Sequence, residues 1–263
     1  MDLGIKGRVA LVTGASAGLG LATAKALSDE GARVAINSRS EENLKKAAEQ
    51  IKEKTGNSTL IYPGDLSLDG KAEEIVDRVS RELGPIEILV VNAGGPPAGP
   101  FMNHSKEVWQ KAADLTLFSS INLARAVIPG IVEKRWGRIV FITSIAVKQP
   151  VDGLIISNTL RAGLTGFAKT VSNEYARFGL TVNTVCPGYT KTERLRELAE
   201  AKSKALGGSI DDIYNDWIAG TPAGRLGNPD ELAALIAFLS SEKAAFITGS
   251  SIAVDGGSYK GLL

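Results

Sequence analysis

The sequence predicts an α/β fold in which one doubly wound parallel sheet of about seven strands carries helices on both faces. Short apolar runs alternate with longer segments whose apolar residues recur at helical spacing. The apolar runs are continuous, as expected for strands buried on both faces. Short turns rich in glycine and proline connect the elements, and no linker, repeat or low-complexity tract interrupts them. We therefore expect residues 1–263 to form a single domain.

The alternation can be followed from one end of the chain to the other. Strands are predicted at residues 9–12, 33–37, 60–63, 88–91, 138–143, 180–185 and 251–254. Helices are predicted at residues 19–30, 41–54, 71–83, 105–135, 153–178 and 230–240. Glycines end several of them, and Asn228 with Pro229 opens the last.

Residues 190–221 depart from this pattern, with helical segments at 193–205 and 210–218 on either side of Gly207-Gly208. Such a pair of helices with a glycine hinge, after a strand, is typical of a substrate lid. Apolar side chains in both segments favour a partly hydrophobic substrate, although they serve equally to pack the lid on the core.

Composition excludes several classes of function. The chain has 30 Lys and Arg against 29 Asp and Glu, so its net charge of +1 creates no field that would recruit nucleic acid or an anionic membrane. Cys186 is the single cysteine, which excludes an intrachain disulfide and fits a reducing compartment. No apolar run reaches the roughly 18 residues of a membrane span, and no signal peptide follows Met1. We expect a cytoplasmic protein with a small-molecule partner and predict no metal site.

The stretch RVALVTGASAGLG, residues 8–20, predicts a phosphate-binding turn. Gly14, Gly18 and Gly20 follow the first strand, and glycine lets the backbone turn tightly, approach a ligand and expose helix N–H groups to an anion. A pyrophosphate is the expected ligand. The spacing is Gly-x-x-x-Gly-x-Gly rather than Gly-x-Gly-x-x-Gly, so the alternative is a plain tight turn.

Two polar positions near this turn bear on the cofactor. Ser38 and Arg39 lie just past the end of the second predicted strand, where a dinucleotide ribose meets an open α/β sheet. An arginine there binds the 2′-phosphate of NADP, whereas an acidic residue would bind the 2′-hydroxyl of NAD. Asp65 either stabilises its own turn or lies beside the adenine, and a lone loop aspartate favours the structural interpretation.

Motifs along the whole chain carry a family resemblance. They are Thr13 to Gly20 in the first turn, Asn92-Ala93-Gly94, Ser144 after the fifth strand, Pro187-Gly188 with Thr192, and Thr248-Gly249 with Val254-Asp255-Gly256-Gly257. In this order and spacing the sequence resembles the short-chain dehydrogenase/reductase family, and its C-terminal part resembles the 3-oxoacyl carrier-protein reductases. The resemblance implies a Rossmann-like fold and a nicotinamide cofactor.

The resemblance also implies which residues hold that cofactor. It favours NADP over NAD, because Ala17 stands where other members carry a basic residue and leaves Arg39 as the discriminator. The expected cofactor-binding residues are Gly14, Ser16, Gly18, Leu19, Gly20, Ser38, Arg39, Asp65, Leu66, Asn92, Ala93, Gly94, Arg161, Pro187, Gly188 and Thr192.

The chain departs from the family in its catalytic residues. The family uses an Asn, a Ser, a Tyr and a Lys, and by alignment these positions hold Thr116, Ser144, Ser157 and Arg161. Only the serine is retained. A serine hydroxyl is a much weaker acid than a phenol and is shorter, while arginine keeps the cation but differs in shape and protonation. Cofactor binding and proton transfer must therefore be judged separately.

Three hypotheses follow for the chemistry. In the first, an oxidoreductase uses Ser157 through a bridging water, with Ser144 and Arg161 polarising the carbonyl. In the second, another residue donates the proton, with Lys148, Tyr189 and then His104 as candidates; their plainer interpretations are a loop charge, a packing ring and a surface residue. In the third, the chain is a catalytically impaired NADP-binding sensor or scaffold.

The resemblance finally implies a homo-oligomer, a tetramer or dimer formed through the long helices and the tail. Phe246, Ile247, Ile252 and Val254 are apolar enough for such an interface, and equally suited to an ordinary core.

Overall fold

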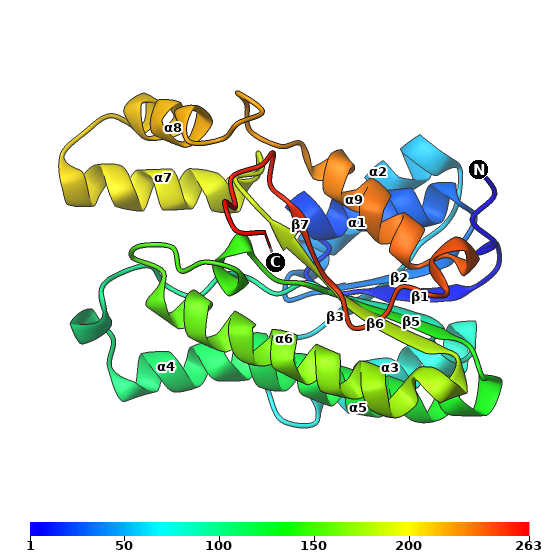
Figure 1. Cartoon of the computed structure of the whole chain (residues 1–263). Helices are drawn as coiled ribbons and strands as arrows, with labels where there is room; N and C mark the ends of the chain where they lie inside the picture. Colours follow the sequence, from blue (N-terminus) through cyan, green and yellow to red (C-terminus); the bar gives the residue numbers. More distant parts are fainter. Residues whose placement is uncertain (263) are drawn as a thin grey trace.

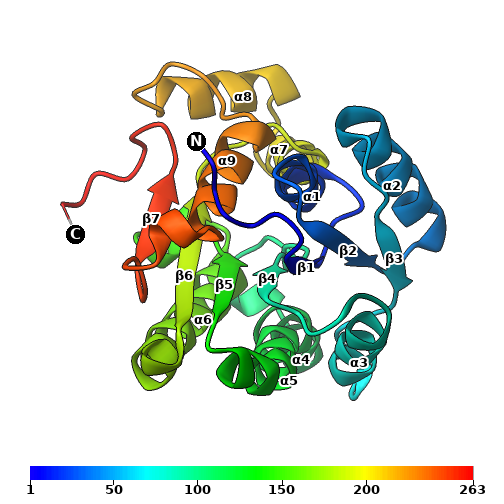
Figure 2. The same cartoon turned by 90° about the vertical axis from the view of Figure 1, so that its right-hand side faces the viewer.

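The computed structural model describes residues 1–262 and contains one seven-stranded sheet in the order β3-β2-β1-β4-β5-β6-β7. All neighbouring strands are parallel. The strands are β1 Val9–Val12, β2 Arg33–Ser38, β3 Leu60–Pro63, β4 Ile88–Val91, β5 Gly137–Ile142, β6 Leu180–Pro187 and β7 Ser251–Val254. Figure 2 shows the sheet nearly along its strands, with helices above and below. The predicted fold class is confirmed.

Two helical layers cover the sheet. One contains α1 Gly18–Asp29, α2 Glu41–Thr55 and α9 Pro229–Leu239, and the other contains α3 Lys71–Leu83, α4 Lys106–Ala113, α5 Ser119–Lys134 and α6 Ile155–Tyr175. Each layer has its own apolar cluster, because the strands are buried on both faces and present side chains to both. The helices α7 Glu193–Leu206 and α8 Ile210–Ala219 lie together at one end of the molecule (Figure 1).

The helix predicted at residues 105–135 is interrupted by a π-helical segment, Asp114–Phe118, between α4 and α5. Side-chain hydroxyls in and just after this segment bond carbonyl oxygens one turn back. Thr116 donates to the carbonyl oxygen of Ala112 at 2.7 Å, and Ser119 donates to that of Leu115 at 2.6 Å. Such side-chain bonds compete with the helical backbone pattern, and π segments of this kind often lie at functional sites.

The stretch Lys106–Lys134 is also long and apolar enough, by length and composition alone, to cross a membrane. The sequence expectation that no run meets this measure was wrong. Within this structure, Leu123, Ala124 and Val127 from the stretch are buried in the core beneath the sheet.

The predicted lid, residues 190–221, holds a small apolar cluster of its own. Leu195 and Ala199 from α7 pack against Ile213 and Trp217 from α8, with Leu226 beside them. Gly207 ends α7 in the left-handed conformation, at φ +78°, where the sequence predicted a hinge. The lid is therefore a unit packed beside the sheet rather than part of it.

The four apolar tail residues divide into two groups. Ile247, Ile252 and Val254 are partly buried against the main core, as the plainer interpretation held. Phe246 is fully exposed, so it alone is free for an interface.

Candidate active site

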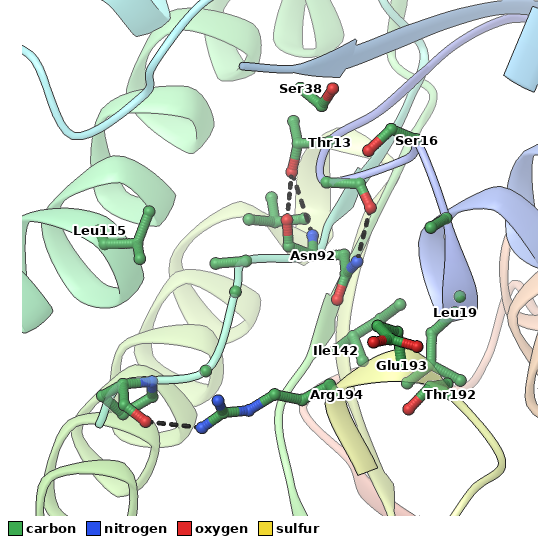
Figure 3. Close-up of a pocket in the computed structure, with 18 of the residues that line it drawn as sticks. Thr13, Ser16, Leu19, Ser38, Asn92, Leu115, Ile142, Thr192, Glu193 and Arg194 are labelled. Carbon is green, nitrogen blue, oxygen red and sulfur yellow. Dashed lines mark hydrogen bonds between the residues drawn. The ribbon is translucent and has the colours of Figure 1, made fainter. Parts of the chain in front are cut away.

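A cleft of about 710 Å³ lies where the carboxyl ends of β1, β4, β5 and β6 meet. Strand order reverses between β1 and β4, because β2 and β3 lie on one side of β1 and the later strands on the other. Ligands of open α/β sheets bind at such a switch point. Figure 3 shows the cleft with loops from both halves of the sheet around it.

The glycine turn forms one end of the cleft and is tied to β4. Asn92 donates through its side-chain nitrogen to the carbonyl oxygen of Gly14 at 3.0 Å, and the Thr13 hydroxyl donates to the carbonyl oxygen of Asn92 at 3.0 Å (Figure 3). A Cβ atom on Gly14 would lie 2.5 Å from that same Asn92 oxygen. The turn therefore requires glycine for close approach as well as for its positive φ of +56°.

Gly20 has a different role from the one predicted. It does not line the cleft among the described residues. A Cβ atom at Gly20 would lie 2.3 Å from the carbonyl oxygen of Gly14, so this glycine lets α1 pack against the turn. It positions the phosphate-binding backbone indirectly.

The end of β2 forms a cationic and hydroxyl-rich corner of the cleft. Ser38, Arg39, Ser40 and Asn43 all line it. Arg39 is exposed, and among residues 1–262 no carboxylate pairs with it. The corner offers a guanidinium and hydroxyl groups without a competing acid, which suits a phosphate.

Asp65 and Leu66 line the cleft next to this corner. The Asp65 carboxylate accepts bonds from the Ser67 backbone at 3.0 Å and the Ser67 hydroxyl at 2.7 Å. It therefore stabilises its own turn, as the structural interpretation held, while lying within the predicted binding surface.

Ser144, Ser157 and Arg161 come together at the far end of the cleft. Ser144 follows β5, where its hydroxyl accepts a bond from the Ala146 backbone at 3.1 Å. Ser157 and Arg161 lie one turn apart on α6 and are 7% and 8% exposed. The Arg161 guanidinium donates to the carbonyl oxygens of Ile142 at 2.9 Å and Thr143 at 3.0 Å.

Burial gives Arg161 unusual electrostatics. Burial, and to a smaller extent the nearby Arg194 charge, lowers the pKa of Arg161 to about 10. The guanidinium still carries its proton at neutral pH. It can thus stabilise negative charge in the cleft but is a poor proton donor.

In the described chain Thr116 does not line the cleft with Ser144, Ser157 and Arg161. It lies in the π-helical segment, it is buried, and its hydroxyl is directed back to Ala112. In the described chain the cleft lining takes its neighbours Leu115 and Ser119 instead.

The other proposed proton donors also lie outside the cleft lining in residues 1–262. Tyr189 stacks on Trp217 with ring centroids 4.7 Å apart, and burial raises its pKa, which makes it a weaker acid. Lys148 lies 5.4 Å from the ring centre of Tyr259, and His104 contacts the Gly99 carbonyl oxygen at 3.3 Å. These positions favour the interpretation of Tyr189 as a packing ring, of Lys148 as a loop charge and of His104 as a surface residue.

The β6 side of the cleft contains Pro187, Gly188 and Thr192. The Thr192 hydroxyl accepts a bond from the Leu195 backbone at 3.2 Å and so begins α7. The predicted nicotinamide-binding residues therefore lie at the start of the lid.

Arg194 is the main site residue that the sequence analysis missed. It extends from α7 across the cleft, and its Nη2 donates to the carbonyl oxygen of Pro96 at 2.7 Å (Figure 3). A Cβ atom on Gly95 would lie 2.5 Å from the Arg194 Nε. The double glycine in the β4 loop was the available signal, but sequence alone does not connect it with a helix a hundred residues later.

Comparison with known proteins agrees with this geometry. Residues 14–259 match the family described as enoyl-(acyl carrier protein) reductase. Acetoacetyl-CoA reductase of Shinella zoogloeoides is 37% identical over 96% of this chain and 98% of its own length. The chain belongs to the short-chain dehydrogenase/reductase family.

Other members of this short-chain dehydrogenase/reductase family give the same result. The 3-oxoacyl-[acyl-carrier-protein] reductase FabG of Escherichia coli is 35% identical over 98% of this chain and 99% of its own length. L-Sorbose reductase from Gluconobacter frateurii, solved with NADPH and L-sorbose, superposes with a TM-score of 0.93 at 34% identity and covers both chains completely. The predicted resemblance is confirmed.

Proposed function

We propose that this protein is an NADP-dependent oxidoreductase that transfers hydride between the nicotinamide and a carbonyl or alcohol substrate, at a site formed by Ser144, Ser157 and Arg161. The observation that carries the proposal is that all three line the same cleft as the glycine turn. The prediction of an oxidoreductase of this family is confirmed by its relatives. The roles of the three residues are our proposal.

The residues present fit NADP. A Cβ atom at Gly14 or Gly20 would collide with Asn92 or with the Gly14 carbonyl, so both glycines keep the turn tightly packed, and its backbone could then bind a pyrophosphate. Arg39, with Ser38 and Ser40, would hold the 2′-phosphate, and Asn92 would lie near the inner ribose. L-Sorbose reductase was solved with NADPH, which supports the cofactor prediction.

The mechanism depends on what replaces the phenol. Bound NADPH supplies the hydride. Arg161 and the Ser144 hydroxyl polarise the carbonyl oxygen, and the cation stabilises the negative charge that develops there. Ser157 is too short to replace the phenol directly, so its hydroxyl relays a proton through a water to the oxygen. Thr116 has no direct role in this scheme, because its hydroxyl bonds its own helix.

The proposal also assigns a role to the helices at residues 190–221. Residues 190–221 would cover a small, partly hydrophobic substrate, since α7 contributes Leu195 and Leu198 to the cleft wall. A cytoplasmic homo-oligomer without nucleic-acid or membrane partners remains our expectation.

A second function, an NADP-binding sensor or scaffold, is favoured by one observation. The binding turn is intact while the phenol and amine of the family are replaced by Ser157 and Arg161. In that case the cofactor binds and no hydride moves.

NADPH oxidation separates the two functions. The natural protein and a Ser157→Tyr/Arg161→Lys variant are tested with ketones, 3-oxoacyl thioesters, sugars and oxo acids. Turnover by the natural protein that falls in Ser144→Ala supports the proposed enzyme. NADPH binding without turnover, with activity only in the double variant, supports the sensor or scaffold.

A further inference from the structure

Arg161 is a buried cation without an ionic partner. It is 8% exposed, and in the described chain its side-chain hydrogen bonds go only to the Ile142 and Thr143 carbonyl oxygens. Both leave from Nη1. A guanidinium has five N–H donors in a planar fork, so the donors on Nε and Nη2 have no partner within residues 1–262. A buried charge left in this way is costly unless a ligand completes it.

The carboxylates that line the cleft are engaged elsewhere. Asp65 bonds Ser67 in the distant β3 turn. Glu193 accepts from the Arg196 Nε at 3.0 Å. Glu197 accepts from the Arg194 Nη1 at 3.1 Å. None of these three pairs with Arg161 in the described residues.

Two further features make the same end of the cleft attractive to an anion. Ser157 is 7% exposed and lines the cleft, and among residues 1–262 its hydroxyl has no hydrogen-bond partner. Arg194 brings a second guanidinium over Gly95 into the lining, where it is paired with Glu197 and can add only part of its charge. Leu115, Ile142 and Leu154 add apolar side chains to the lining, and charge interactions are stronger beside apolar surface than in bulk water.

We propose that the substrate is a 2-oxo acid, whose carboxylate is held by the free donors of Arg161, while the Ser157 hydroxyl remains available to relay the proton. Arginine suits this task because its fork matches the two oxygens of a carboxylate. In a 2-oxo acid the ketone oxygen adjoins the carboxylate, so one guanidinium can reach both.

The inference rests on the proposed function. The reaction is the two-electron reduction of a 2-oxo acid by NADPH. Hydride moves from C4 of the nicotinamide to the carbonyl carbon, and the carbon–oxygen double bond becomes single. A solvent proton reaches the oxygen by way of Ser157. NADPH is oxidised to NADP⁺ and the 2-oxo acid is reduced to a 2-hydroxy acid.

The test compares 2-oxopentanoate with its methyl ester, which differ in charge. Dissociation constants are measured by calorimetry on the protein saturated with NADP⁺, so no turnover is needed. The acid should bind about 10- to 100-fold more tightly than the ester, as expected for hydrogen bonds to a charged group. In Arg161→Gln the dissociation constants of the acid and the ester should differ by no more than about threefold, because the positive charge that attracts the carboxylate is lost. Arg177→Gln, which removes an exposed cation just after the end of α6, should keep the preference.

Arg161→Lys guards against misfolding of the Gln variant, because it retains the charge and should retain part of the preference. Equal affinities for acid and ester in the natural protein would overturn the inference. So would an Arg161→Gln variant that loses NADP⁺ affinity but keeps the acid preference, because Arg161 would then serve the cofactor. Acid preference without any turnover would contradict only the proposed enzyme, and turnover of neutral ketones with no acid preference would contradict only this inference.

Discussion

The Nη2 of Arg194 donates to the carbonyl oxygen of Pro96 across 2.7 Å, and this bond joins α7 to the loop after β4. The guanidinium passes directly over Gly95, where a Cβ atom would lie 2.5 Å from Nε. Lid and loop are therefore connected across the mouth of the cleft, at a position that only glycine allows.

Gly95→Ala should break this connection, because the methyl group displaces the guanidinium from Pro96. Amide exchange across α7 should accelerate about tenfold, consistent with the loss of one hydrogen bond to a charged group. Arg194→Gln should have a similar effect. Gly163→Ala on α6, where a Cβ meets no atom within 4 Å, serves as the control. Unchanged exchange in both lid variants would show that the bond does not hold α7.

Gly20→Ala should destabilise the protein and weaken NADPH binding together. Its Cβ would lie 2.3 Å from the Gly14 carbonyl oxygen, so α1 must move away from the turn. We expect a loss of about 1–3 kcal/mol in the free energy of unfolding, the usual cost of overpacking. Urea unfolding and NADPH titration measure the two effects. Full stability with full NADPH affinity would contradict the packing role.

Arg39→Gln should weaken NADPH binding about 10- to 100-fold and leave NADH binding nearly unchanged, because only NADPH carries the 2′-phosphate. Fluorescence titration of both cofactors checks this. Arg33→Gln removes an exposed arginine from the opposite end of the same strand and should alter neither affinity. Equal losses for the two cofactors in Arg39→Gln would refute the phosphate role.

The preference for 2-oxopentanoate over its ester should be constant from neutral pH to pH 9 and fall as the pH rises through about 10. Burial lowers the pKa of Arg161 to about 10, and the protonated form is the one that binds the anion. Deprotonation therefore removes the preference at high pH. In Arg161→Lys the fall should begin at lower pH, because lysine starts from an ordinary pKa near 10.4 and burial lowers it. A loss of preference between pH 6 and 8 would assign the binding to another group.

Most of the fold was predictable because its signals are local. Continuous apolar runs such as Val9–Val12 marked buried strands, and glycines marked the ends of helices. The π-helical segment around Thr116 was not predictable, because the spacing of apolar residues does not distinguish one π-helical turn from an α-helical one.

The site was predictable where neighbours in sequence act together. The Gly14 turn, Arg39 and the pair Ser157 and Arg161 lie in the cleft as expected. Gly20 and Thr116 do not line it in the described chain, because the direction of a close contact or of a hydroxyl depends on tertiary packing. The meeting of Arg194 with Gly95 joins segments far apart in the chain, and a single sequence carries no such information.

Transfer of deuterium from labelled NADPH measures the proposed reaction itself. The natural protein is incubated with NADPH deuterated at C4 and with 2-oxopentanoate or a neutral ketone, and mass spectrometry locates the label in the product. If the proposed hydride transfer occurs, we expect one deuterium on the new carbinol carbon. The amount of labelled product should fall in Ser144→Ala and in Arg161→Gln. Saturable NADPH binding without any labelled product, together with label transfer by Ser157→Tyr/Arg161→Lys, would contradict the proposed hydride transfer.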